Sequence, residues 1–135
     1  MLLAFALQAD AQLAIGKPEA VLESVAAGLT VVGKTGGAPL EAELYRLRGE
    51  ALLAGAGTVS EAETAMQQAI AVARRQNAKS WKLRGAMSLA RLRRQQGRQL
   101  EAVALLAPIL GWFTEGFDTA DLKDAKALLD GLEPA

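Results

Sequence analysis

The chain has 135 residues, of which 51% are hydrophobic and 22% are charged, a composition typical of one globular domain and not of a disordered chain. Fifteen basic residues balance fifteen acidic ones, so the net charge indicates neither a nucleic-acid nor a membrane partner. The sequence contains no Cys and no His, which excludes disulfides, thiol catalysis and imidazole general-base catalysis, and we expect no metal or other cofactor.

The N-terminal segment lacks the pattern of an export signal. Residues 1–16 contain no Lys or Arg, and Gln8, Asp10 and Gln12 interrupt their apolar run. No later stretch reaches the roughly 20 apolar residues that a membrane-spanning helix needs. We therefore expect a cytoplasmic protein. Met1 leads straight into a helical pattern without a capping residue, which indicates a fragment of a longer chain.

Helix-forming residues dominate, and Gly and Pro divide them into segments. The sequence predicts an all-α fold with helices over residues 2–15, 18–32, 40–54, 60–77, 79–96, 98–111 and 119–131. Gly33 is predicted to end the second helix. Ser60 and Glu63 have the spacing of a capping box, and Asp118 or Thr119 can cap the last helix. Short connections predict antiparallel hairpins.

A Glu-Ala pair recurs near the start of alternate helices, at residues 19, 61 and 101, which is the spacing of a helical hairpin. The clearest unit consists of Leu89, Ala90, Arg93, Gln96, Gly97, Glu101, Ala102, Leu106 and Ile109. It resembles the tetratricopeptide repeat, in which small residues let the two helices of a hairpin pack closely. The second unit repeats the pattern with Leu47, Gly49, Ala62, Met66 and Ala69. This resemblance implies a single solenoid domain over residues 1–135, with hairpins at 2–33, 39–77 and 79–111 and a capping helix at 119–131.

The last third of the chain carries a narrower resemblance. Residues 107–122, continuing to 130, are similar to the C-terminal end of large bacterial regulatory proteins, as are residues 43–50 and 71–76. Such proteins combine a nucleotide cyclase or other output domain, an AAA-type ATPase and a long tetratricopeptide tail. The resemblance implies a regulatory tail. Any cyclase or ATPase activity would lie on other domains, so we expect no enzyme activity from this chain.

One segment matches a nucleotide-binding motif. Residues 28–35, GLTVVGKT, fit the phosphate-binding loop G-x-x-x-x-G-K-[ST] at every fixed position. Such a loop needs a preceding strand and a helix that begins at the Lys-Thr pair. Here the preceding pattern is helical, and residues 36–39 prevent a helix from starting at Lys34. We interpret the segment as a helix end, and nucleotide binding is the alternative function.

Charge is distributed unevenly along the chain. Residues 74–98 contain nine basic residues and no acidic one, whereas residues 115–133 are mainly acidic. Because the first helix of each tetratricopeptide hairpin lines the concave surface, the resemblance places five residues there: Arg46, Arg84, Met87, Arg91 and Arg94. Guanidinium groups bind carboxylates and phosphates through paired donors. We therefore predict a non-catalytic module that binds an acidic protein or peptide. The alternatives are a basic face that only balances the acidic helix, and nucleic-acid binding, which the lack of interleaved aromatic residues disfavours.

Large apolar side chains gather at both ends of the predicted array. Trp112, Phe113 and Phe117 are predicted to form a buried plug that anchors the capping helix. At the other end the N-terminal helix carries Leu2, Leu3, Phe5 and Leu7. No predicted repeat covers these residues, so we expect self-association through the N-terminal hairpin.

Overall fold

The computed structural model describes residues 2–35, 40–113 and 119–132. These residues form α1 (Leu2–Ala14), α2 (Pro18–Thr35), α3 (Glu41–Ala51), α4 (Val59–Arg75), α5 (Lys79–Gln95), α6 (Gln99–Leu110) and α7 (Ala120–Leu132). A short, wider helical turn, η1 (Leu52–Ala56), follows α3. No β-strand occurs in the described part of the chain. The predicted all-α fold is confirmed.

The end of the second helix differs from the prediction. The helix continues through Gly33 to Thr35, and a Cβ added at Gly33 would meet no other atom within 4 Å. A glycine inside a helix costs only about 1 kcal/mol relative to alanine, so it ends a helix only where the chain also turns. Gly16, with a φ of +76°, lies at such a turn between α1 and α2.

The start of α4 also differs. The capping box is formed by Thr58 and Glu61, not by Ser60 and Glu63. The Thr58 hydroxyl accepts from the backbone N–H of Glu61 at 3.1 Å, and the Glu61 carboxylate accepts from the backbone N–H of Thr58 at 3.0 Å. The helix therefore begins at Val59, one residue earlier than predicted. At α7, the Thr119 hydroxyl accepts from the N–H of Leu122 at 3.4 Å, while Asp118 lies outside the described residues.

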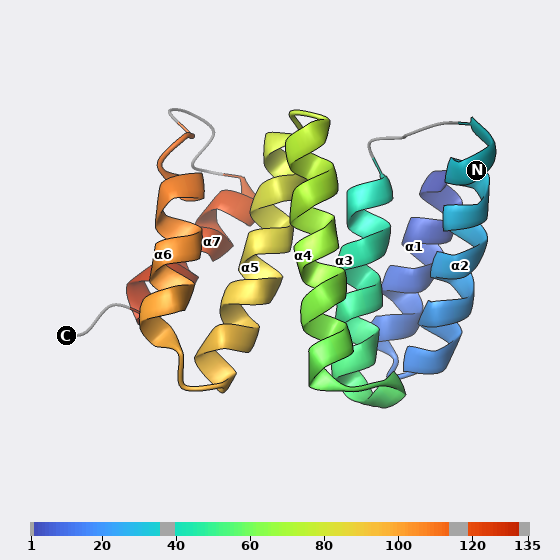
Figure 1. The fold of residues 1–135 in the computed structure, drawn as a ribbon, viewed down its shortest axis with the longest axis horizontal. Helices are drawn as coiled ribbons and strands as arrows, with labels where there is room; N and C mark the ends of the chain where they lie inside the picture. The colour runs from blue at the N-terminus through green and yellow to red at the C-terminus, as the bar shows by residue number, and fades with distance from the viewer. Residues whose placement is uncertain (1, 36–39, 114–118, 133–135) are drawn as a thin grey trace.

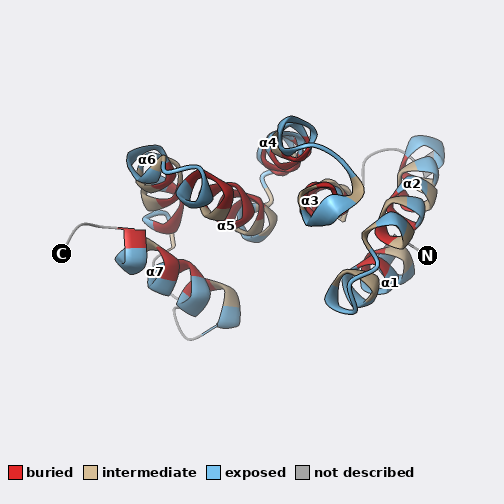
Figure 2. Cartoon of the chain, turned by 90° about the horizontal axis from the view of Figure 1, so that it is seen from below, coloured by how far each residue is buried: buried red, intermediate tan, exposed pale blue. Residues whose placement is uncertain are grey.

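The helices are arranged in two layers (Figures 1 and 2). Each helix packs against the next one along the chain, and α1 contacts α3, α3 contacts α5, and α5 contacts α7. In the described residues α2 does not reach α4, and α4 does not reach α6. Viewed end-on in Figure 2, the odd-numbered helices form one layer, in which α1 and α7 project beyond α3 and α5. This layer is curved inward, and we call it the odd-helix face.

Small residues set the distance between neighbouring helices, both within a pair and between one pair and the next. A Cβ added at Gly49 of α3 would lie 2.8 Å from Met66 Cγ and 3.1 Å from the Ala62 carbonyl oxygen of α4. A Cβ added at Gly85 of α5 would lie 3.1 Å from Ile70 Cγ1. Four predicted small positions of the second and third hairpins, Ala62, Ala69, Ala90 and Ala102, are fully buried. The predicted close approach at these positions is confirmed.

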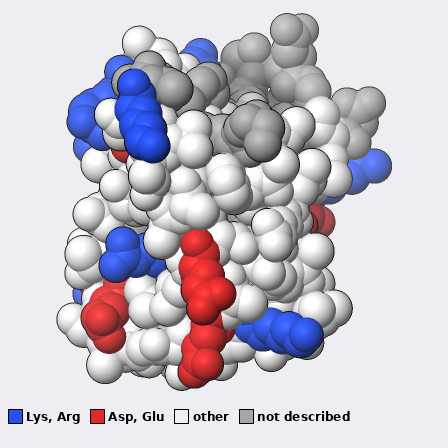
Figure 3. All heavy atoms as spheres, turned by 90° about the vertical axis from the view of Figure 1, so that its right-hand side faces the viewer, with Lys and Arg blue, Asp and Glu red and all other residues white. Residues whose placement is uncertain are grey.

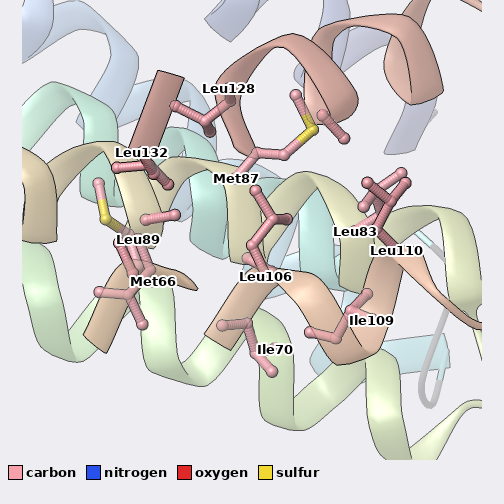
Figure 4. Packing of buried hydrophobic residues seen from close by; sticks show 14 of the residues in the cluster. Met66, Ile70, Leu83, Met87, Leu89, Leu106, Ile109, Leu110, Leu128 and Leu132 are labelled. Atoms are coloured by element: carbon pink, nitrogen blue, oxygen red, sulfur yellow. The ribbon is translucent and has the colours of Figure 1, made fainter. Parts of the chain in front are cut away.

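The two largest of four buried apolar clusters in the described chain lie between the layers. The larger one combines α4 to α7 and includes Met66, Leu83, Leu106 and Leu128, which Figure 4 shows spread along the cluster with Leu106 near its middle. The smaller one combines α1, α2 and α3. In both, large side chains from one helix occupy space between the helices of the neighbouring pair.

The aromatic plug predicted at the C-terminal end is wrong for Trp112. This side chain is 51% exposed, because α6 ends at Leu110 and Trp112 turns outward. Phe113 packs against the larger cluster, and Phe117 lies outside the described residues. The apolar face of α7 itself covers the end of the cluster, with Leu122, Ala125, Leu128 and Leu132 buried.

Candidate partner-binding surface

Four of the five predicted binding residues line one small pocket on the odd-helix face. The pocket has a volume of about 120 Å³ and is lined by Arg46, Arg84, Met87, Arg91, Asp121 and Asp124. Helices α3, α5 and α7 supply these residues, so the pocket depends on contacts between consecutive odd-numbered helices. The fifth predicted residue, Arg94, is exposed outside the pocket. Two aspartates share the pocket with the arginines, so its lining is of mixed charge.

Glu43 is the centre of a buried ion-pair network. Its carboxylate is 7% exposed and accepts from Arg46 Nη2 at 2.5 Å and from Arg46 Nε at 3.0 Å. Burial opposes the charge of Arg46, but the hydrogen bonds and the attraction from Glu43 outweigh it, and the pKa of Arg46 is raised. Because Arg46 is itself only 9% exposed, this arginine is a structural cation and not a free binding group.

Arg84 extends the network across three helices. Its Nη2 donates to Glu43 Oε1 at 3.1 Å, and its Nη1 lies 3.5 Å from Asp121 Oδ1 on α7. Arg46 Nη1 also donates to the Ser88 hydroxyl of α5 at 3.4 Å. Arg84 Nε is buried and has no hydrogen-bond acceptor in the described chain. The network joins α3, α5 and α7. Most of its charged groups therefore pair with one another across the odd-numbered helices.

The remaining predicted residues divide into core and surface. Met87 is 4% exposed and belongs to the larger apolar cluster, so only its edge reaches the pocket. Arg91 is half-buried and Arg94 is exposed, and neither forms an ion pair with any described residue. Of the five predicted binding residues, these two arginines of α5 are the cations that remain available to a partner.

Comparison with known proteins adds no assignment. No family model, curated protein or solved structure matches this chain. The described residues contain no group of three or more side chains placed to hold a metal ion. None of the described helices combines the length and the apolar character that crossing a bilayer demands.

The sequence did not reveal how much of the basic segment is paired. Arg93 Nη1 lies 2.6 Å from Glu63 Oε1 of α4, and Arg98 Nη2 donates to Glu101 at 2.7 Å. The Arg98–Glu101 pair lies three residues apart on adjoining turns and was readable from sequence spacing. The Arg93–Glu63 pair joins two helices, and no spacing rule within one helix finds it.

Residues 28–35, which match the phosphate-binding motif, lie within α2 and not in a loop. A helix interior uses its backbone N–H groups in internal hydrogen bonds, so they cannot surround a phosphate. Gly28 has a packing role instead, because a Cβ there would lie 2.8 Å from Leu44 Cδ1 of α3. Thr30 likewise donates its hydroxyl to the Ala26 carbonyl of the same helix at 3.0 Å.

Proposed function

We propose that the chain is a tetratricopeptide-like solenoid that binds an acidic protein or peptide on the odd-helix face and catalyses no reaction. The contact pattern supports the architecture, since each odd-numbered helix from α3 onward packs against both helices of the preceding pair. Solenoid repeats contact only their neighbours and present one continuous inner surface. The resemblance of residues 89–109 to the repeat pattern supports the same assignment.

The single observation that carries the binding proposal is the unpaired state of Arg91 and Arg94 beside an otherwise neutralised network. The two residues lie three positions apart on α5 and therefore share one face of the helix. Carboxylates of an acidic peptide provide the counter-charges, and guanidinium groups bind them through paired donors. Arg84, with a side chain 33% exposed, borders the same surface.

A labelled peptide of ten glutamates tests this surface by fluorescence anisotropy. The double variant Arg91→Gln and Arg94→Gln is compared with Lys123→Gln and Lys126→Gln, which removes the same charge from exposed positions of α7. We expect the arginine variant to bind at least about tenfold more weakly than the lysine variant. Equal losses in the two variants, or no binding by the unaltered protein, would overturn the proposal.

Two alternatives have direct tests. A labelled single-stranded oligonucleotide of equal charge should bind more weakly than the glutamate peptide, since the described odd-helix face offers no row of aromatic side chains for base stacking. For nucleotide binding at residues 28–35, calorimetry with ATP and magnesium should give no heat of binding. Micromolar affinity that is lost in Lys34→Ala would favour the nucleotide-binding alternative.

The N-terminal end of the molecule provides a second surface. Leu3 and Leu7 of α1 are 55% and 61% exposed, and Figure 3 shows uncharged surface on both sides of a column of acidic side chains at the end formed by α1 and α2. Leu3 and Leu7 lie four positions apart and share one face of α1, and apolar side chains grouped on an exposed face commonly mark a contact surface. We propose that this end mediates self-association.

As a cytoplasmic regulatory tail, the chain would influence an attached ATPase or cyclase only if its partner preferred one state of that protein.

A further inference from the structure

A second basic pocket lies where α4 leads into α5, close to the end of α6. It has a volume of about 130 Å³, and its lining includes Arg74, Asn77, Ala78, Lys79, Lys82 and Trp112. None of these residues lines the arginine pocket on the odd-helix face. Among the described lining residues, three are basic and none is acidic. The pocket therefore concentrates positive charge without an internal counter-charge.

Lys82 is the buried cation of this pocket. The residue is 6% exposed, and its Nζ lies 3.9 Å from the ring centroid of Trp112. Its ammonium group makes no hydrogen bond or ion pair with any described residue, while its backbone N–H donates to the Ala78 carbonyl at 2.9 Å. Burial and the nearby Arg74 lower the pKa of Lys82. The Trp112 ring contacts one side of the ammonium, and the N–H donors of Lys82 have no oxygen acceptor among the described residues.

The N-terminus of α5 opens onto the same pocket through Ala78 and Lys79. Ala78 is the N-cap residue, and it provides no side-chain acceptor. The first turn of α5 contains no acidic residue. The backbone N–H groups of residues 79–81 consequently have no acceptor within the described chain. By contrast, α4 has both a threonine cap and Glu61 at its start.

We propose that this pocket binds a single phosphate group. The backbone donors of the α5 N-terminus and the ammonium of Lys82 come from α5, and the guanidinium of Arg74 comes from the last turn of α4. A tetrahedral oxyanion has acceptor oxygens in several directions and can meet such donors together, whereas the two oxygens of a carboxylate lie in one plane. Helix N-termini also favour anions through the helix dipole. This site is separate from the proposed binding surface for acidic partners.

Two-dimensional amide NMR with inorganic phosphate tests the proposal, using sodium chloride at matched ionic strength as the reference. We expect saturable shifts of the amides of residues 79–81 and of the Trp112 indole, with a dissociation constant of about 1 mM or lower. Lys82→Met keeps the apolar stem beneath Trp112 and removes the charge, and it should weaken binding at least about tenfold. Lys123→Met, at an exposed position of α7, should leave binding unchanged.

A second variant and two further ligands complete the experiment. Arg74→Gln changes an exposed side chain and should also weaken phosphate binding severalfold, which keeps the test valid if Lys82→Met unfolds. N-acetyl phosphoserine amide distinguishes the source: tighter binding than inorganic phosphate indicates a phosphorylated chain, and equal binding indicates free phosphate. Three results would overturn the proposal. Chloride could produce the same amide shifts, acetate could bind with the same affinity as phosphate, or neither variant could change phosphate binding.

Discussion

Glu43 of α3 and Arg84 of α5 are joined across 41 residues of chain, with Arg84 Nη2 donating to Glu43 Oε1 at 3.1 Å. The same carboxylate neutralises Arg46, whose side chain is only 11% exposed. Glu43 therefore compensates two cations on the odd-helix face. Through Arg84 this carboxylate connects α3 directly to α5.

Removing Glu43 should destabilise the fold strongly. Glu43→Ala leaves Arg46 buried without its counter-charge, and we expect a loss of about 3–5 kcal/mol in the free energy of unfolding. Urea denaturation followed by circular dichroism measures it. Glu41→Ala, two residues earlier on α3 and without an ion pair to a described residue, should cost less than about 1 kcal/mol. Similar losses in the two variants would show that the network has no structural role.

Two glycines of helices should respond in opposite directions to alanine. Gly49→Ala places a Cβ 2.8 Å from Met66 Cγ and 3.1 Å from a backbone oxygen, so we expect a net loss of about 1–2 kcal/mol. Gly33→Ala adds a methyl group in open space within α2, and it should raise the stability by up to about 1 kcal/mol. Thermal unfolding of both variants checks the pair. A loss in Gly33→Ala would contradict the extension of α2 to Thr35.

Trp112→Ala should be only moderately destabilising. Because the ring is 51% exposed and contacts Lys82, we expect a cost of about 1–2 kcal/mol from the lost cation–π contact and partial burial. A buried plug would instead cost about 3–5 kcal/mol. The variant also opens Lys82 to water, so the pKa of Lys82 should rise toward its ordinary value. Lysine NMR titration measures this rise, and an unchanged pKa would contradict the shielding role of Trp112.

The capping box of α4 predicts both a stability difference and a pH dependence. Thr58→Ala should cost about 1 kcal/mol, whereas Ser60→Ala should be nearly neutral. Hydrogen bonds from the backbone and the hydroxyl of Thr58 lower the pKa of Glu61. The folded state therefore binds this proton less tightly than the unfolded state. The stability that the Glu61 carboxylate contributes is fully present above the ordinary pKa of glutamate. It is lost as the pH falls through the lowered pKa of Glu61 in the folded state.

NMR titration of Glu61 checks the second part of this prediction. In Thr58→Ala the pKa of Glu61 should return toward its ordinary value, while in Ser60→Ala it should stay lowered. The opposite result, a Glu61 pKa that stays lowered in Thr58→Ala and changes in Ser60→Ala, would indicate a cap formed by Ser60 and Glu63.

Self-association should depend on the exposed face of α1. Leu7→Glu places a charge on a residue that is 61% exposed, so folding should be preserved while any dimer is weakened. Sedimentation velocity over a range of concentrations measures the change. Leu100→Glu is the matched control, because Leu100 is 82% exposed on α6 at a distance along the array. A strictly monomeric unaltered protein at high concentration would remove this proposal.

The helices and their close contacts were predictable from the sequence because their signals are local. Apolar spacing along a helix, Pro18 at a helix start and small residues such as Gly49 and Ala90 act within a few turns of chain. The errors at Gly33 and Ser60 have the same origin. Several nearby residues could end or cap a helix, and the packing of the segment selected one of them.

The tertiary structure alone decided which charges are free. Composition shows nine basic residues in one segment, yet Glu43, Glu63 and Asp121 approach that segment from other helices. The strength of such ion pairs depends on the distance between the charges and on their burial. When the partners lie some 30 or more residues apart, the sequence indicates neither quantity. Packing likewise turned Trp112 outward over Lys82, because the end of α6 at Leu110, and not the apolar character of the ring, determines its direction.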